Sequence, residues 1–317
     1  MKAIVLKQPG GTENLEIRDI ALPAIKDNEV LVRTHAVSIN PVDAYVRSNE
    51  DALNGILQPV AGEDIILGWD ISGEVTAVGT QVTQFKPGDA VFGMVNFVGH
   101  GKTYAAYVAA PASHLALKPA NTSYEAAAAA TLAALTAWQA LVTYGRIKKG
   151  DKVLIHAAAG GVGHYAVQIA KHFGAYVIGT SSAAKKDAVL RFGADEHIDY
   201  NSQAFEELVT GADIVLDSIG APGHLDRSLA AVKDGGRLIS LLTFLNDEQK
   251  EKAAARHITA QRMFVASNGA DMASIAALLA SGELHSDIAH VYPFEEMAAA
   301  HAQISTGKTQ GKIVVKI

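Results

Sequence analysis

The sequence predicts an α/β protein of two domains: a β-rich domain of antiparallel, barrel-like strands, and a domain built on a doubly wound parallel sheet. Three observations support this prediction. The chain has 317 residues, a length that favours two domains over one. Its first third carries short runs of alternating apolar residues between turn residues, which is typical of antiparallel strands. After residue 120, strand-like and helix-like runs alternate, as in a parallel sheet with helices on both faces.

The β-rich domain contains six runs with the period-2 alternation or the β-branched residues of strands. These runs are residues 1–7, 15–22, 29–39, 71–79, 89–95 and 104–110. Glycine, proline, asparagine and aspartate separate them. In "FKPGDAV", Pro87, Gly88 and Asp89 predict a tight turn between two strands.

A long helix is expected to open the second domain, over residues 122–145. Thr122 stands three residues before Glu125, the spacing of a capping box, and Gly145 ends the alanine-rich pattern. Four strands and three helices should follow in alternation. The strands are expected at 151–157, 175–180, 213–220 and 236–242, and the helices at 162–173, 183–192 and 224–232.

The alternation stops after residue 260. Two alanine-rich helices are expected at 270–281 and 294–305, followed by the terminal strand "GKIVVKI". This strand has no helix and strand of its own to pair with, so we expect it to rejoin the first domain. The predicted boundaries are therefore 1–120 completed by 261–317 for the β-rich domain, and 121–260 for the parallel-sheet domain.

Composition excludes several classes of function. The formal net charge of −6 provides no basic field for nucleic acid or anionic membranes. With no cysteine, the chain cannot form disulfides, thiolate nucleophiles or cysteine-ligated metal sites. Its 12 histidines form no HxH or HxxxH pair, although a site assembled from distant segments stays open. The apolar run at 3–6 is too short for a secretory signal, and 126–142 favours a buried helix, so we expect a soluble, cytoplasmic protein.

The stretch "HAAAGGVGHYA" predicts a phosphate-binding turn. Gly160, Gly161 and Gly163 lie between a buried strand and an amphipathic helix, the context that a dinucleotide-binding turn requires. Glycine lets the backbone approach a pyrophosphate, and the first N–H groups of the helix face the anion. The pattern is AxxGxxG rather than GxGxxG, with Ala157 and Ala158 near the usual first glycine.

The end of the next strand favours NADPH over NADH. An NAD site would carry a carboxylate there for the ribose hydroxyl, but "VIGTSSAAKK" offers only hydroxyls and cations, with no carboxylate nearby to repel a phosphate. Thr180, Ser181, Ser182, Lys185 and Lys186 suit a 2′-phosphate. The alternative is an ordinary helix start, with Ser182 as its N-cap and with solvated lysines.

The whole chain resembles the medium-chain dehydrogenase/reductase superfamily, and within it the zinc-independent quinone oxidoreductase branch that includes zeta-crystallin. The segments "AVSINPVDAYVR", "GWDISGEVTAVG", "FKPGDAVFG", "AATLAALTAWQAL", "HAAAGGVGHYAVQIAK", "FGADEHIDY" and "GKIVV" occur in the family's order. The resemblance implies a GroES-like catalytic domain, a Rossmann domain with NADPH in the cleft, and a homodimer formed through the sheet edge at "RLISLL". Where zinc-dependent relatives have a cysteine and a histidine ligand, this chain has Asn40 and Trp69, which implies a metal-free site with Trp69 in the core or pocket wall.

The resemblance also assigns roles to residues of the cofactor site. The glycine turn, including Val162, would face the pyrophosphate; Ser181, Ser182, Lys185 and Tyr200 would surround the 2′-phosphate. Thr136 would lie near the nicotinamide ribose, and the backbones of Ser218 and Ile219 near the adenosine. The residues expected to flank the nicotinamide are Leu242, Thr243, Phe264 and Val265.

Without a metal to polarise a carbonyl, hydride transfer needs an acceptor that is already electrophilic, a quinone or an α,β-unsaturated carbonyl. Asn40 and Tyr45 are candidate catalytic donors to its oxygen, or positioning groups. Alternatively, Asn40 organises a turn, and Tyr45 is a half-buried aromatic. Asp43 and Arg47 of the same segment could form a pair, and Lys312 is expected to be a solvated strand-end residue that could reach the cofactor.

The sequence therefore predicts an NADPH-dependent reductase of quinones or activated alkenes. Two alternatives stay open at this point: an enoyl-thioester reductase of the same superfamily, and a non-enzymatic NADPH-binding sensor or structural protein.

Overall fold

The computed structural model describes residues 1–317, which divide into two compact units. Unit 1 comprises 1–135 and 266–317, and unit 2 comprises 136–265. Both divisions fall later in the chain than the predicted boundaries at 120 and 260. The first is displaced because Ala128 and Ala129 pack against Ala36 and Val314, which holds the start of the alanine-rich segment in unit 1.

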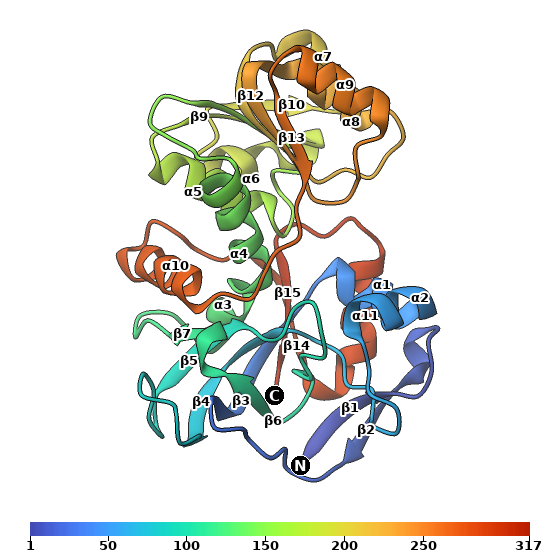
Figure 1. Ribbon diagram of the computed structural model, residues 1–317, viewed down its shortest axis with the longest axis vertical. Helices are drawn as coiled ribbons and strands as arrows, with labels where there is room; N and C mark the ends of the chain where they lie inside the picture. The colour runs from blue at the N-terminus through green and yellow to red at the C-terminus, as the bar shows by residue number, and fades with distance from the viewer. The chain divides into compact units, whose positions relative to one another are not determined.

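Unit 1 is built on a mostly antiparallel sheet with the strand order β14-β15-β3-β4-β5-β7, in which β6 also pairs with β3 (Figure 1). A separate hairpin, β1 and β2, completes its strands. The strand bounds are β1 Lys2–Leu6, β2 Leu15–Asp19, β3 Glu29–Ile39, β4 Asp70–Val78, β5 Ala90–Met94, β6 Tyr107–Pro111, β7 Leu115–Leu117, β14 Ile288–Pro293 and β15 Lys312–Lys316. The six predicted strands of the first third are confirmed.

The terminal strand rejoins unit 1, as predicted. β15 pairs antiparallel with β3, with Val314 opposite Ser38, and pairs in parallel with β14. β14 was not predicted, because this strand is largely exposed and shows no apolar alternation. The helices of this unit are α1 Pro41–Ser48, α2 Glu50–Ala52, α3 Tyr124–Ala129, α10 Gly269–Ser281 and α11 Met297–Ser305, with a π-helical turn at Leu53–Leu57.

The prediction of one long helix over 122–145 is wrong. The segment forms α3, then α4 (Leu132–Trp138), then a π-helical turn at Gln139–Tyr144. Two hydrogen bonds mark the break: the Asp70 carboxylate accepts from the Leu132 N–H at 2.9 Å, and the Thr131 hydroxyl donates to the Ala128 carbonyl at 2.7 Å. The N-cap is Ser123, not Thr122; its hydroxyl accepts from the Ala126 N–H.

Unit 2 is a six-stranded, all-parallel sheet with the order β10-β9-β8-β11-β12-β13. Figure 1 shows α5 and α6 on one face of this sheet and α7, α8 and α9 on the other, as right-handed crossovers in both directions require. The bounds are β8 Lys152–Ile155, α5 Gly163–His172, β9 Tyr176–Ser181, α6 Lys186–Arg191, β10 Glu196–Asp199, α7 Phe205–Leu208, β11 Ala212–Asp217, α8 His224–Ala231, β12 Val232–Ser240, α9 Asp247–Ala255 and β13 Thr259–Arg262. The predicted combination of a β-rich, mostly antiparallel domain and a doubly wound parallel-sheet domain is confirmed.

The prediction that "RLISLL" is an edge strand, through which a homodimer would form, is wrong. The "RLISLL" segment begins in β12, which lies between β11 and β13 and has no free edge. The edge strands of this sheet are β10 and β13. Across the molecule, no helix combines the length and the apolar character that spanning a bilayer requires.

Candidate active site

The predicted cofactor residues of unit 2 gather at one edge of its sheet. Because all six strands are parallel, their carboxyl ends share that edge. Each strand is followed there by predicted residues. They are Gly160–Gly163 after β8, Ser181 at the end of β9 with Ser182 and Lys185 after it, Tyr200 after β10, Ser218 and Ile219 after β11, Leu242 and Thr243 after β12, and Phe264 and Val265 after β13. The remaining one, Thr136, lies on α4 and is buried.

The glycine turn lies where the strand order reverses. β8 is central: the chain runs outward from it through β9 and β10, and then returns to place β11 on its other side. Ligands of doubly wound sheets bind at such a switch point, beyond the carboxyl ends of the strands. The turn leads into the amino end of α5, where the His164 N–H donates to the Gly160 carbonyl at 3.1 Å and the Ala166 N–H donates to the Val162 carbonyl at 3.0 Å.

The backbone of the turn fits a close approach to an anion. A Cβ on Gly163 would lie 2.2 Å from the Ala157 carbonyl oxygen and 2.7 Å from the Ala158 Cα, so only glycine fits there. Ala157, at the position of the usual first glycine, has a φ of 49°, in the left-handed region that favours glycine. Gly160, Gly161 and Val162 are half-exposed, which leaves this backbone open to a ligand.

The region predicted for the 2′-phosphate contains an additional histidine. His197, on β10, lies 2.8 Å from the Ser181 hydroxyl. Burial, followed by the charge of Lys186, lowers the pKa of His197; burial also lowers the pKa of Lys185. Tyr200 is 60% exposed, and its N–H donates to the Ser181 carbonyl at 3.2 Å. Pairing "EHID" in parallel with "YVIGTS" would have placed His197 here from the sequence.

Two expectations for this region are wrong. Thr180 does not face the phosphate region, because it is buried and its hydroxyl lies 3.1 Å from Nδ1 of His156. A carboxylate does stand nearby: Asp199, on β10, is the register partner of Ser181 and accepts from the Ala183 N–H at 3.2 Å. The Ser202 hydroxyl, the Asn201 backbone N–H and the Asn201 side-chain amide also donate to Asp199, so its carboxylate accepts from four donors.

At the carboxyl ends of β12 and β13, the predicted residues are mostly apolar and exposed, unlike the polar residues after β9 and β10. Leu242 is 56% exposed and Phe264 is 48% exposed, whereas Val265 is buried. The Thr243 N–H donates to the Ser240 hydroxyl at 3.1 Å, which fixes the turn after β12. The two ends of this edge therefore differ in chemistry, polar after β9 and β10 and apolar after β12 and β13.

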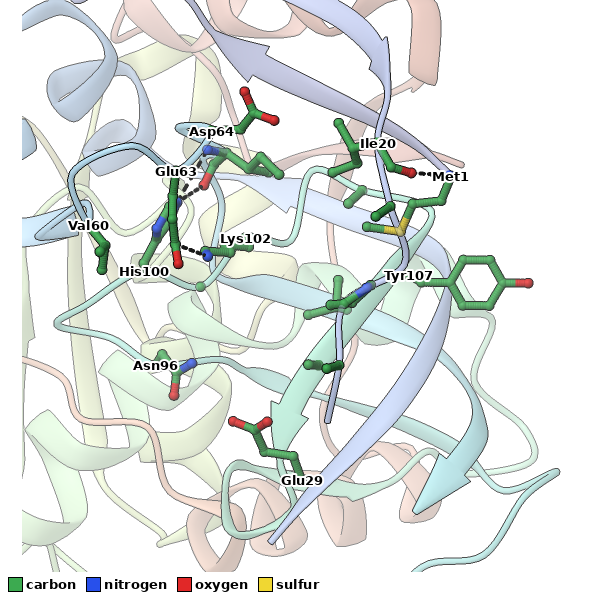
Figure 2. A pocket seen from close by; sticks show the side chains of 18 of the residues that line it. Met1, Ile20, Glu29, Val60, Glu63, Asp64, Asn96, His100, Lys102 and Tyr107 are labelled. Carbon is green, nitrogen blue, oxygen red and sulfur yellow. Dashed lines mark hydrogen bonds and ion pairs between the residues drawn. The ribbon is translucent and has the colours of Figure 1, made fainter. Parts of the chain in front are cut away.

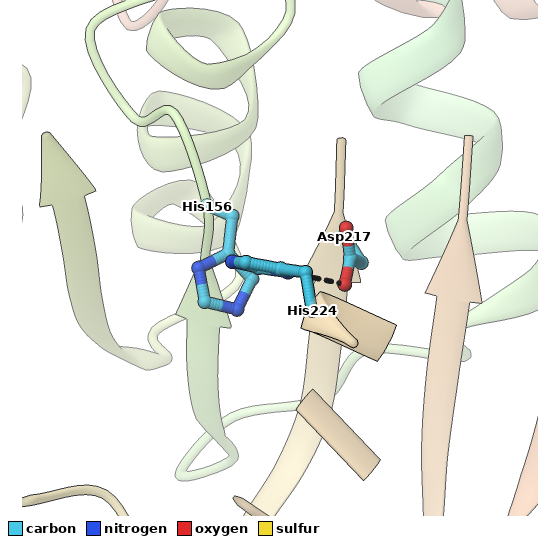
Figure 3. A group of neighbouring side chains, drawn as sticks. All are labelled: His156, Asp217 and His224. Carbon is cyan, nitrogen blue, oxygen red and sulfur yellow. Dashed lines mark hydrogen bonds and ion pairs between the residues drawn. The ribbon is translucent and has the colours of Figure 1, made fainter. Parts of the chain in front are cut away.

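A buried polar network joins the strands beneath this edge. Figure 3 shows His156, Asp217 and His224 side by side; His224 lies 3.0 Å from Asp217 through Nδ1. The Ser228 hydroxyl donates to Asp217 at 2.7 Å and lies 3.1 Å from Nε2 of His156. Burial lowers the pKa of His156 to about 3, so its ring is neutral near pH 7. The Ser218 hydroxyl donates to the His156 carbonyl, so the network ties β11 to the start of the glycine turn.

This network tests the possibility of a histidine metal site assembled from distant segments. The ligand atoms of His156, Asp217 and His224 lie within 4.8 Å of one another, close enough for one ion. However, Ser228 already bonds within the group, and Asp217 Oδ1 accepts from the Ile219 N–H at 2.8 Å. Both ring nitrogens of His156, both carboxylate oxygens of Asp217 and Nδ1 of His224 have hydrogen-bond partners within the protein, so we interpret the group as structural.

In unit 1, Asn40 belongs to a second buried network. Its amide nitrogen donates to Asp70 at 2.7 Å, and its amide oxygen accepts from the Lys312 ammonium at 2.5 Å. Its backbone N–H donates to the Asp43 carboxylate at 2.7 Å, which caps α1 as a turn-organising residue would. Ser38 also donates to Asp70 at 2.9 Å. Asn40 is 2% exposed and has one amide hydrogen left for a ligand.

The structure corrects the other expectations for this segment. Lys312 is not solvated but 3% exposed, 3.9 Å from Asp70. Asp43 and Arg47 do not pair; Arg47 donates to His301 at 3.2 Å and to the Gly10 carbonyl. Tyr45 is more open than half-buried, with 55% of its surface exposed.

The Asp43 carboxyl makes the stability of the protein depend on pH. Burial, and then the charge of Asp70, raise the pKa of Asp43 from 3.8 to about 7. The folded state therefore binds a proton that the unfolded state releases at lower pH, and this contribution to stability declines as the pH rises towards 7. We expect the unfolding free energy of the wild type to fall, relative to that of Asp43→Asn, between about pH 4 and about pH 7. Urea titrations across this range measure the difference, and parallel profiles would contradict it.

A cavity of about 740 Å³ lies elsewhere in unit 1 (Figure 2). Its lining is mixed in charge and includes Glu29, Glu63, His100 and Lys102, of which Glu63 and Lys102 form an ion pair at 2.5 Å. None of the predicted site residues lines it. The chemistry of the sheet edge in unit 2, rather than the volume of this cavity, therefore guides the assignment of function.

Two family models match the chain. The alcohol dehydrogenase GroES-like domain matches residues 26–120, and the zinc-binding dehydrogenase family matches residues 192–315. These matches correspond to the β-rich domain and to the later part of the chain, respectively.

Individual relatives match along the full length. Quinone oxidoreductase from Homo sapiens is 32% identical over 331 residues, which cover 99% of this chain and 97% of the relative. The chloroplastic NADPH-dependent alkenal/one oxidoreductase of Arabidopsis thaliana is also 32% identical, over 99% of this chain and 79% of the relative. The solved quinone oxidoreductase from Coxiella burnetii superposes with a TM-score of 0.91 at 33% identity, covering 100% of this chain and 99% of that one.

Proposed function

Because the chain belongs to the medium-chain dehydrogenase/reductase superfamily, in its quinone oxidoreductase and alkenal reductase branch, we propose that it is an NADPH-dependent, zinc-independent reductase of quinones or α,β-unsaturated carbonyls. One observation carries the proposal: the carboxyl ends of all six strands of unit 2 bear residues suited to successive parts of a dinucleotide.

The residues of this edge would hold the cofactor from end to end. The backbone of Gly160–Gly163 and the amino end of α5 would bind the pyrophosphate. Ser181, Ser182, Lys185 and Tyr200 would bind the 2′-phosphate, with His197 beside Ser181. Hydrogen bonds from the Ser202 hydroxyl and the Asn201 backbone lower the pKa of Asp199 and keep its carboxylate charged, so Lys185 and Lys186 would have to offset this charge when the 2′-phosphate binds. When bound, NADPH supplies the hydride for the acceptor.

The residues at the expected zinc-ligand positions support a metal-free reaction. Trp69 is buried, and its indole N–H donates to the Gly99 carbonyl at 2.7 Å. Asn40 accepts from the ammonium of Lys312, and a buried cation at that distance opposes the binding of a divalent ion. An acceptor with a conjugated carbonyl is electrophilic without a metal. Tyr45, with an exposed side chain, is the better donor to its oxygen, and Asn40 would position α1.

Turnover tests this function directly. Purified protein is mixed with NADPH and a panel of quinones, enals, enones and enoyl thioesters, with and without a chelator. We expect NADPH oxidation with quinones or with enals and enones, unaffected by the chelator. Tight NADPH binding without oxidation would identify the sensor alternative, a preference for enoyl thioesters would identify the other reductase, and loss of activity with chelator would refute the metal-free reaction.

Replacement of Lys185 tests the choice of cofactor. The Lys185→Ala variant should raise the KM for NADPH by about tenfold or more and leave the KM for NADH within about twofold, because only NADPH carries the 2′-phosphate. Lys149→Ala is a matched control, since this exposed lysine precedes β8 and lies at the opposite edge of the sheet. Equal changes for both cofactors would refute the assignment.

A further inference from the structure

Arg262, the last residue of β13, is a cation with aromatic neighbours and no acidic partner. Its guanidinium carbon lies 4.2 Å from the ring centroid of Phe244 and 4.2 Å from that of Phe264. The two rings are 6.2 Å apart and inclined at 53°. The Nε of Arg262 is buried and makes no hydrogen bond. Burial lowers the pKa of Arg262, and no acidic side chain opposes the shift.

The lack of an acidic partner distinguishes Arg262 from Arg227 and Arg256 of the same unit. Arg227 also lies over a ring, that of Phe205, but pairs with Glu206 at 3.4 Å; Arg256 pairs with Asp234 at 2.8 Å. A buried donor without an acceptor costs about 1–3 kcal/mol, so a native structure that retains one calls for an explanation. The two rings stabilise the positive charge but provide no oxygen to accept from the guanidinium plane.

The position of Arg262 separates it from the phosphate-binding residues. β13 lies four strands from β9, and at about 4.8 Å per strand the two carboxyl ends are roughly 19 Å apart. The 2′-phosphate region after β9 is therefore out of reach of Arg262. Its two ring neighbours are exposed, Phe244 at 67% and Phe264 at 48%, and Leu242, after β12, is 56% exposed.

We propose that Arg262 binds a carboxylate carried by the hydride acceptor, whose conjugated part packs against Phe244 and Phe264. The planar guanidinium can donate two parallel hydrogen bonds to the two oxygens of a carboxylate, the pairing that it lacks within the protein. The rings supply apolar area for the unsaturated part of the same molecule. The proposal rests on the proposed function and specifies its substrate class: quinones or enones that bear an anionic group.

A carboxylate substrate and its neutral methyl ester test this proposal. Benzoylacrylate and its methyl ester share the same enone, and only the first carries a carboxylate. We expect the wild type to show a kcat/KM for the acid at least about tenfold above that for the ester. Arg262→Gln should remove this preference and leave the ester within about twofold, whereas Arg227→Gln, which removes a ring-stacked arginine that has a partner, should change neither. The proposal would be overturned if the wild type had the same kcat/KM for the acid and the ester, or if Arg262→Gln lowered kcat/KM equally for both substrates.

A binding measurement separates failure of this proposal from failure of the proposed function. Turnover of the ester reports on the function alone, because the ester does not need Arg262. The saturated analogue benzoylpropionate cannot be reduced at a double bond, and calorimetry in the presence of NADPH gives its Kd. If neither enone is turned over, Arg262→Gln should still raise the Kd of benzoylpropionate by about tenfold. An unchanged Kd would overturn the carboxylate site.

Discussion

Gly163→Ala is expected to destabilise unit 2 and to abolish tight NADPH binding. The new Cβ would lie 2.2 Å from the Ala157 carbonyl oxygen and 2.7 Å from the Ala158 Cα, and both of these are backbone atoms that cannot rotate away. The turn must therefore move, which costs about 1–3 kcal/mol of unfolding free energy or more. Because the same backbone would bind the pyrophosphate, we expect the Kd for NADPH to rise by at least about a hundredfold.

Two further glycines provide a graded control. A Cβ on Gly160 would lie 3.1 Å from the Ala157 carbonyl oxygen, so Gly160→Ala should lower the unfolding free energy much less than Gly163→Ala. A Cβ on Gly55, in unit 1, would meet nothing within 4 Å, so Gly55→Ala should leave the unfolding free energy and the Kd for NADPH unchanged. Urea unfolding and fluorescence titration with NADPH measure the series. Equal losses of unfolding free energy in Gly163→Ala and Gly160→Ala would refute the steric explanation.

Lys312→Met is the second substitution from which we expect a large effect. Lys312 is 3% exposed, its ammonium donates to Asn40, and it lies 3.9 Å from the buried Asp70. Methionine keeps the apolar volume but leaves Asp70 without the cation. Removing one partner of a buried pair typically costs about 3–5 kcal/mol, a large part of the stability of a domain. We therefore expect a marked loss of unfolding free energy and a low kcat with any acceptor.

Lys316→Met is the matched control, because this lysine stands on the same strand and 68% of its side chain is exposed. It should change stability by no more than about 0.5 kcal/mol. If the unpaired charge of Asp70 causes the loss, Asp70→Asn combined with Lys312→Met should be less destabilising than the sum of the two single variants. Strict additivity would show that the two side chains act independently.

Local patterns allowed much of unit 2 and its cofactor site to be predicted. The glycine turn, the strand before it and the helix after it are neighbours in the chain, and their spacing alone identifies the turn. The ends of β9, β11 and β12 were found in the same way. Local patterns do not give the order of strands in the sheet. His197 and Asp199 are therefore not predicted, and "RLISLL" is wrongly predicted to be an edge strand.

Long-range contacts explain the other differences. The Asp70 carboxylate that interrupts the predicted long helix comes from 62 residues earlier, and no pattern near residue 132 reveals it. Lys312 has the polar character of an exposed strand-end residue, and only its contact with Asn40, 272 residues away, keeps it buried. In the sequence, Arg262 has no feature that distinguishes it from a surface arginine. Only the folded chain brings Phe244, between β12 and α9, and Phe264, after β13, against its guanidinium. In each case, the pairing of distant segments determined the outcome.

The discontinuity of unit 1 has a consequence for the order in which the chain can fold during synthesis. Its central strand β3 is translated early, yet the lysine that reaches the Ile39 carbonyl from β15 follows 273 residues later. Unit 2 is continuous and leaves the ribosome before β15 does, and domains generally fold as units in the order of synthesis. We therefore expect unit 2 to be formed while residues 36–39 of β3 still lack their neighbour on one side, because β6 pairs only with residues 29–33 there. A nascent chain at that stage would expose an unpaired apolar strand, which is the kind of surface that chaperones bind.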